Sequence, residues 1–255
     1  MIRALLVGIN EYKTKPLRGA LNDVERMRAY LKSRGVADGA VAVLPEAQAT
    51  KVKIEQSLVA LLNSGEPGDH LLFYFSGHGS QQPSADPDES DGLDEVLCPI
   101  DWRDDPETSL SDNRIAEIVA SLRPGASLTL VFDACHSGDG AAIGPEQGTR
   151  FQPTSSRPPR RQKRARWSKV RATLSEGSML VAACADSETA VEARFEFVPF
   201  GVFTWHFTNI LSQEEGLTVR DAVKQTGVEV KQHDMHPQID PPSTALADKP
   251  FLASA

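Results

Sequence analysis

Two short apolar runs constrain the fold of this chain more than any other feature of its sequence. Residues 71–75 read LLFYF and residues 128–132 read LTLVF. Runs of this length and composition are typical of strands that are buried on both faces of a parallel sheet. In open α/β sheets, active sites form just beyond the carboxyl ends of the strands. The residues that follow the two runs are therefore expected to meet at one edge of the sheet.

Strand and helix signals alternate along the chain, which predicts an α/β fold with a largely parallel central sheet and helices on both faces. We predict strands near residues 2–9, 40–44, 70–75, 127–132, 178–184 and 237–240. We predict helices near residues 18–34, 51–63, 112–122, 201–212 and 217–231. Because no linker separates two periodic regions, the chain is expected to form one domain.

Two reactive side chains follow the apolar runs. His78 lies in Ser76-Gly77-His78-Gly79, and Cys135 lies in Asp133-Ala134-Cys135-His136. An imidazole beside a thiol is the arrangement of a histidine-activated nucleophile, with His78 as base and later as acid. His136 is not expected to be catalytic, because adjacent strand residues point to opposite faces. Cys98 and Cys184 are expected to be buried structural cysteines.

These motifs resemble those of the caspase-like cysteine peptidases, most closely the metacaspase/orthocaspase branch. The matching motifs are ALLVGIN at 4–10, LRGALND at 17–23, YFSGHG at 74–79, DGLDE at 91–95 and DACHSG at 133–138. The separation of His78 and Cys135 is close to the roughly 50 residues typical of caspases. The resemblance implies a caspase-like three-layer sandwich and a single catalytic domain over 1–255. Its parts would be a large portion (1–150), a basic linker (150–175) and a small portion (176–255).

The resemblance also implies the parts of a peptidase site. The backbone amides of Gly79 and Cys135 would form the oxyanion hole. Asp23, Ser76 and Asp133 would line the primary specificity pocket, whose two carboxylates would select Arg or Lys before the scissile bond. Two alternatives stay open on the residues alone: Asp23 as a helix-capping carboxylate and Asp133 as a structural turn acid. Ala20 stands where relatives often carry Cys.

An acidic segment has two interpretations. Ten Asp and Glu residues lie between Asp86 and Glu107. In many metacaspases a calcium ion binds acidic groups near the active site and activates the enzyme, and hard cations prefer such oxygen ligands. The matching positions are Asp94 and Asp112, with Asn113 and Asp139 as further candidates. The other interpretation is a solvated acidic loop, since the chemistry itself requires no cofactor.

The net charge of the whole chain is −8, but one basic segment contrasts with an otherwise acidic sequence. Nine Arg and Lys residues and no acids lie from Arg150 to Arg171. The segment could be a linker that the enzyme cuts or that mimics a substrate, a solvated loop, or an arm for nucleic acid. We favour the linker, because a peptidase selecting Arg or Lys could cut it. The candidate self-cleavage residues are Arg157, Arg160, Arg161, Lys163, Arg164, Arg166, Lys169 and Arg171.

The bulk properties limit the remaining function classes. No apolar stretch approaches 18 residues, the first residues do not resemble a signal peptide, and three cysteines give no disulfide framework. We therefore expect a cytoplasmic cysteine endopeptidase that acts on peptides or proteins, does not insert into a membrane and does not bind nucleic acid. The resemblance favours a monomer that is made as a zymogen and processes itself. The alternative is a catalytically silent caspase-like module that acts through protein interactions.

Overall fold

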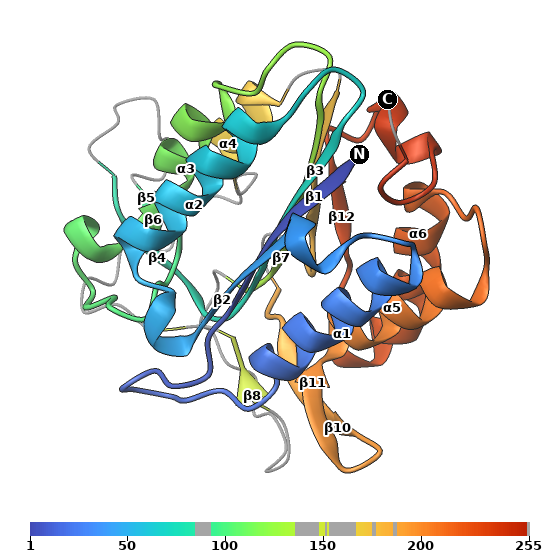
Figure 1. Cartoon of the computed structure of the whole chain (residues 1–255). Coiled ribbons are helices and arrows are strands. Elements are labelled where there is room, and N and C mark those ends of the chain that lie inside the picture. The colour runs from blue at the N-terminus through green and yellow to red at the C-terminus, as the bar shows by residue number, and fades with distance from the viewer. Residues whose placement is uncertain are drawn as a thin grey trace.

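The centre of the molecule is a six-stranded sheet in the order β12-β9-β7-β3-β1-β2 (Figure 1). The computed structural model describes residues 1–84, 93–135, 148–150, 152, 167–174, 177–185 and 188–253. The strands of this sheet are β1 (Ile2–Gly8), β2 (Val41–Pro45), β3 (His70–Ser76), β7 (Ser127–Asp133), β9 (Ser178–Ala182) and β12 (Gln238–Asp240). Five strands run parallel, and β12 pairs antiparallel with β9.

Helices cover both faces of the sheet, which confirms the predicted three-layer α/β architecture. On one face lie α1 (Ala20–Ser33), α5 (Val202–Gln213) and α6 (Val219–Val230); on the other lie α2 (Lys51–Ser64), α3 (Asp112–Val119) and α4 (Ser168–Thr173) (Figure 1). Short 3-10 helices are η1 (Asp38–Ala40), η2 (Glu46–Gln48), η3 (Pro106–Thr108), η4 (Lys231–His233) and η5 (Ala245–Asp248).

The pleat of the strands explains why two separate cores form. Successive side chains of a strand point to opposite faces. In β3, Tyr74 therefore packs into the core beneath α1, α5 and α6, while Phe73 and Phe75 pack into the core beneath α2, α3 and α4. All three side chains are buried. The two apolar runs of the sequence are thus the central strands β3 and β7, buried on both faces.

The register of the central strands places their ends at one level. Ser76 at the end of β3 lies opposite Asp133 at the end of β7. His78 and Cys135 each follow two residues later, so the chain after both strands emerges at the same edge. This confirms the arrangement that the apolar runs predicted.

Two small sheets were not predicted. The first contains β4 (Gly79–Pro83), β5 (Leu93–Leu97) and β6 (Leu110–Ser111), of which β5 lies within the acidic segment 86–107. The second contains β8 (Gly148–Thr149), β10 (Val191–Phe195) and β11 (Val198–Gly201). Polar, proline-interrupted strands lack the apolar periodicity on which the prediction rested.

The basic linker predicted between the large and small portions falls mostly outside the described residues, but α4 lies within it.

Within the described part of the chain, no helix is long and apolar enough to cross a membrane.

His70, the first residue of β3, makes the stability of the fold depend on pH. One ring nitrogen contacts Thr129 Oγ1 and the other the Ala253 carbonyl oxygen, both at 2.8 Å. Burial lowers the pKa of His70 to about 4, the Ala253 contact raises it, and Lys249 and the N-terminal amine lower it further. The unfolded chain therefore takes up a proton near pH 6.5 that the folded chain does not take up until about pH 4.

We expect the free energy of unfolding to fall as the pH is lowered from about 7.5 to about 5, with His70 contributing about 2 kcal/mol of that loss. His70→Gln cannot titrate, so its unfolding free energy should be lower at the higher pH but should fall less between the two values. Urea denaturation at both pH values measures this, in chains that also carry Cys135→Ala to prevent proteolysis. Equal losses in the two chains would contradict the assignment.

Candidate active site

Three residues predicted to line a specificity pocket do come together. Asp23 lies on α1, Ser76 ends β3 and Asp133 ends β7, and all three are fully buried. Ser76 Oγ donates a hydrogen bond to Asp23 Oδ2 at 2.8 Å. The Asp23 carboxylate also accepts from the Gly201 amide at 2.9 Å, so it faces the pocket and does not cap its helix.

Asp133 is fixed from the opposite side. Its Oδ2 accepts hydrogen bonds from the Thr204 hydroxyl at 2.6 Å and the Thr204 amide at 3.2 Å. Gly201 and Thr204 form one wall of the pocket. Gly201 lies so close to Asp133 that a Cβ added there would be 2.3 Å from Asp133 Oδ2. The pocket therefore combines residues of the predicted large portion with Gly201 and Thr204 of the predicted small portion.

Arg150 fills this pocket with its own side chain, which is fully buried. One guanidinium nitrogen lies 2.5 Å from Asp23 Oδ2. The other lies 3.1 Å from Asp133 Oδ1 and donates to Ser76 Oγ at 2.6 Å and to the Asp133 carbonyl oxygen at 3.0 Å. The pocket thus holds a guanidinium between two carboxylates, a strongly directional arrangement.

The electrostatics of the pocket follow from burial and from this pairing. Burial raises the pKa of Asp23 to about 6, the charge of Arg150 lowers it, and the neighbouring Asp133 raises it. Burial alone would lower the pKa of Arg150, but the attraction of Asp133, Asp23 and then Glu192 outweighs it and raises the pKa above its usual value. Two buried carboxylates this close require a cation or a proton between them.

The backbone of Arg150 meets the two predicted oxyanion-hole amides. Its carbonyl oxygen accepts hydrogen bonds from Gly79 N at 2.9 Å and from Cys135 N at 3.4 Å. The carbonyl of an arginine whose side chain fills the pocket therefore lies against the amide of Cys135. The Arg150 carbonyl oxygen thus lies between the two amides that the sequence analysis assigned to an oxyanion hole.

The ring of His78 is oriented by its neighbours. Nε2 lies 2.6 Å from the carbonyl oxygen of Lys15, which can only accept, so Nε2 carries the proton and Nδ1 holds the free electron pair. Nδ1 is buried and makes no hydrogen bond to the described residues. Burial lowers the pKa of His78 to about 4, although the carbonyls of Lys15 and Arg150 act to raise it. The ring is thus neutral near pH 7, with Nδ1 available as a base.

Tyr12 holds the segment that carries His78. Its hydroxyl accepts a hydrogen bond from His78 N at 3.0 Å and donates one to the Cys98 carbonyl oxygen at 2.9 Å. The rings of Tyr12 and His78 lie 4.6 Å apart between centroids. Gly77 makes this approach possible, because a Cβ there would lie 2.6 Å from the Tyr12 hydroxyl.

The two acids predicted to bind calcium, Asp94 and Asp112, both accept hydrogen bonds from Asn113. The Asn113 side chain donates to Asp94 Oδ1 at 3.0 Å, and the Asn113 backbone donates to Asp112 Oδ1 at 2.8 Å. Both carboxylates are buried. Among the described residues, however, no group of three or more His, Cys, Asp or Glu could hold a metal ion. Asp139 lies outside the described residues, so the donor set fits a calcium ion only in part.

The structure describes only some of the remaining residues that the sequence analysis singled out. Lys169 and Arg171 lie on α4, and Arg171 Nε is 2.9 Å from Asp240 Oδ2. Cys98 and Cys184 are buried, as predicted. Outside the described residues lie His136, Arg157, Arg160, Arg161, Lys163, Arg164 and Arg166.

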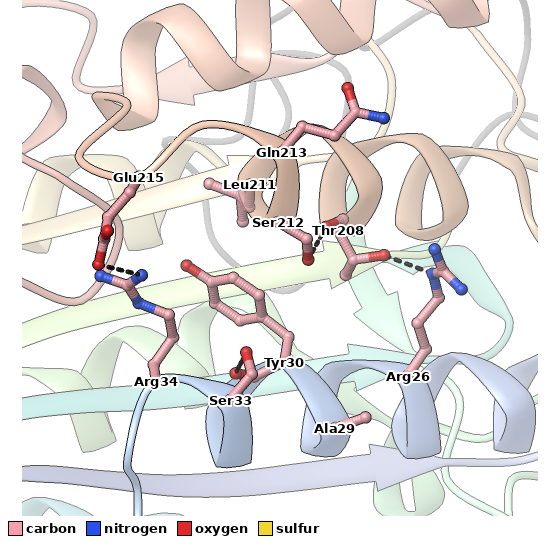
Figure 2. A pocket seen from close by; sticks show the side chains of 10 residues that line it. All are labelled: Arg26, Ala29, Tyr30, Ser33, Arg34, Thr208, Leu211, Ser212, Gln213 and Glu215. Carbon is pink, nitrogen blue, oxygen red and sulfur yellow. Dashed lines mark hydrogen bonds and ion pairs between the residues drawn. The ribbon is translucent and has the colours of Figure 1, made fainter.

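A separate cavity of about 530 Å³ lies between α1 and α5 (Figure 2). The Tyr30 side chain points toward it, and Arg26 donates to Thr208 Oγ1 at 2.6 Å on one side. Its lining residues include none of the pocket or oxyanion-hole residues. It is therefore distinct from the candidate active site.

Sequence reasoning missed several residues of the site. In the sequence, Arg150 stands out only as part of the basic segment, and no local pattern marks its side chain as the one that enters the pocket. Glu192 accepts hydrogen bonds from the amides of Arg18 and Gly19 at 3.1 and 2.9 Å, and so fixes the chain before α1. Tyr12 acts on His78 across 66 residues of sequence. These contacts join distant segments, which motif spacing does not reveal.

The sequence of the chain is similar to those of known metacaspases. A family model described as a metacaspase, peptidase C14 domain matches residues 2–143. Metacaspase-1A of Aspergillus niger is 42% identical over 145 residues, covering 53% of this chain and 35% of that protein. Metacaspase-1 of Emericella nidulans is 41% identical over the same length, covering 53% and 35%. The match thus spans about a third of the length of these curated relatives.

A solved structure shows the same fold. It is the crystal structure of protein GSU0716 from Geobacter sulfurreducens, which matches with a TM-score of 0.71 at 21% sequence identity. The match covers 100% of this chain and 99% of that one. At this identity the likeness concerns the fold alone.

Tyr12→Phe should lower both stability and turnover. The change leaves the buried amide of His78 and the carbonyl of Cys98 without the hydroxyl that joins them, which costs about 1–3 kcal/mol. Tyr30→Phe is a matched control, because both tyrosines are 6% exposed and Tyr30 lines the separate cavity. Urea denaturation and kcat/KM on an arginine peptide measure the effect. Equal changes in the two variants would contradict a positioning role for Tyr12.

Proposed function

The chain belongs to the metacaspase family of peptidase C14 domains, and from this premise we propose that it is a cysteine endopeptidase cleaving after Arg or Lys. Cys135 is the nucleophile and His78 the base. The observation that carries the proposal is the position of Arg150, whose side chain fills the acidic pocket while its carbonyl accepts from Gly79 and Cys135. A substrate arginine would be held in the same way.

The proposed reaction proceeds through a thioester with Cys135. His78 Nδ1 takes the proton of the Cys135 thiol, and the sulfur attacks the carbonyl carbon of the substrate. The amides of Gly79 and Cys135 donate to the oxygen as it gains charge, and this stabilisation is typically worth a few kcal/mol. The imidazolium then gives its proton to the departing amine. Water hydrolyses the thioester and restores the thiol.

The preference for Arg over Lys follows from the number of carboxylates that each side chain can contact. The guanidinium of Arg150 reaches Asp23 with one nitrogen and Asp133 with the other. The single ammonium of Lys cannot form this two-sided contact. An Asp side chain would be rejected, because a third carboxylate would enter a buried pocket that already contains two.

We predict that the chain hydrolyses peptides with Arg before the scissile bond faster than matched peptides with Lys, and does not cut peptides with Asp there. Asp133→Asn should lower kcat/KM for the Arg peptide at least about tenfold, roughly 1.4 kcal/mol or more, because a buried guanidinium loses a charge partner. Cys135→Ala should have no activity. Fluorogenic peptides that differ only at this residue provide the measurement.

Cys184→Ala is the control for this experiment, because Cys184 is also buried but lies after β9. It should retain turnover. Activity in Cys135→Ala would exclude the proposed nucleophile, and efficient cutting after Asp would exclude the acidic pocket. A folded chain with no turnover on any peptide would favour the catalytically silent interaction module.

We further propose self-processing in the segment between Cys135 and β9, where the sequence analysis predicts cutting within 157–171. Of the eight candidate residues, the structure describes only Lys169 and Arg171, both on α4. Peptidase substrates generally bind as extended strands, so these two residues would first have to leave their helix.

We also propose that the protein is a cytoplasmic monomer that acts on proteins. The three free cysteines are compatible with a reducing compartment.

Calcium activation is a separate proposal, with Asp94 and Asp112 as the residues that would hold the ion. The support is their burial beside Asn113. Calcium should raise the melting temperature of the Cys135→Ala chain, and combined Asp94→Asn and Asp112→Asn changes should remove this rise. Asp38→Asn, a surface change, should not. An equal rise in all three chains would exclude this site.

A further inference from the structure

The segment around Arg150 lies in the site as a peptide substrate would. We propose that the peptide bond after Arg150 is the first bond this enzyme cuts, and that until then Arg150 excludes other substrates. This rests on the proposed peptidase function and names the regulation of the same site. Arg150 is not among the cleavage residues predicted from the sequence.

The residues before Arg150 bind as an added strand. Gly148 and Thr149 form β8, which pairs antiparallel with β10 through Thr149 opposite Val191 and Gly148 opposite Glu192. The Arg150 amide continues this ladder by donating to the Ala190 carbonyl oxygen at 3.0 Å. Strand addition is a common mode of peptide recognition, in which main-chain hydrogen bonds set the register.

The Arg150 side chain occupies the pocket completely. Among the described residues it is the one Arg or Lys that is buried, with an exposed fraction of 0%. Its contacts with Asp23, Asp133 and Ser76 use both terminal nitrogens. Because protein interiors are close-packed, a second guanidinium cannot enter while Arg150 remains.

The chain on the other side of the scissile bond is held as well. The Gln152 amide donates to the Gly79 carbonyl oxygen at 3.0 Å, and its own carbonyl accepts from Ser80 Oγ at 2.6 Å. The Gln152 side chain donates to the Thr14 carbonyl and accepts from Thr14 Oγ1. The chain is therefore held by hydrogen bonds both before and after the bond that follows Arg150, and the Arg150 carbonyl oxygen accepts from the Cys135 amide.

The cut balances with water as the only co-reactant. The Cys135 sulfur bonds to the Arg150 carbonyl carbon, the bond to the nitrogen of Phe151 breaks, and that nitrogen receives the thiol proton through His78. Water then releases Arg150 as a free carboxylate and restores the thiol. Cutting separates Arg150 from the contacts of Gln152, which pass to the other fragment. Arg150 then binds with fewer contacts, so an external peptide can displace it.

The first test needs no catalysis. In a Cys135→Ala chain, the tethered Arg150 competes at an effective concentration on the order of millimolar. A labelled peptide Gly-Thr-Arg-Phe-Gln should therefore bind at least about tenfold more tightly once Arg150→Gln is added. Arg123→Gln, a surface change on the same background, should not alter its affinity. The peptide Gly-Thr-Asp-Phe-Gln should bind to none of the chains. If Arg150→Gln brings no gain in affinity for the arginine peptide, the proposal that Arg150 excludes other substrates is overturned.

The second test locates the cut. The active chain should yield a small fragment whose N-terminal residue is Phe151, identified by N-terminal sequencing and intact mass. Arg150→Gln should not yield this fragment, yet should hydrolyse Arg peptides without a lag, whereas Arg150→Lys should still be cut there. A first cut elsewhere in an active chain would overturn the inference alone. A chain that hydrolyses no peptide in any variant would instead overturn the proposed function, and this inference with it.

Discussion

Two carboxylates buried in one pocket determine how the rest of the site is arranged. Asp23 and Asp133 are both fully buried, and such a pair is stable only with a cation or a shared proton between them. Burial raises the pKa of Asp23 to about 6, the charge of Arg150 lowers it, and the charge of Asp133 raises it. The pocket therefore favours a guanidinium for a physical reason that is independent of any substrate.

The pocket is assembled from segments that lie far apart in the sequence. Asp23 comes from α1, Ser76 and Asp133 from the ends of two central strands, and Thr204 from α5. The parallel register of β3 and β7 brings Ser76 and Asp133 to the same level. Thr204 then orients Asp133, so the pocket depends on the order of strands in the sheet as much as on the residues that line it.

The fold was predictable because local patterns determine it. The apolar runs predicted β3 and β7, and their parallel register places the segments that carry His78 and Cys135 at one edge of the sheet. Arg150 and Tyr12 were not predictable, because each acts through contacts with segments more than 60 residues away. The strands β4 and β8 escaped prediction for a related reason. Their short polar sequences are stabilised by pairing with β5 and β10, and not by apolar alternation.

A cut after Arg150 would change the occupant of the pocket and leave the sheet intact. β7 precedes the cut and β9 follows it, yet the two strands pair in parallel from Leu128 opposite Ser178 to Phe132 opposite Ala182. The core beneath α1, α5 and α6 likewise contains residues from both sides of the cut. Hydrophobic burial does not depend on the continuity of the backbone, so both fragments would keep the contacts that stabilise them.

The wall formed by Gly201 and Thr204 belongs to the second fragment, whereas Asp23, Ser76 and Asp133 belong to the first. The pocket can therefore persist only while the fragments remain together. If the chain is cut after Arg150, the specificity of the product would depend on the pairing of β7 with β9.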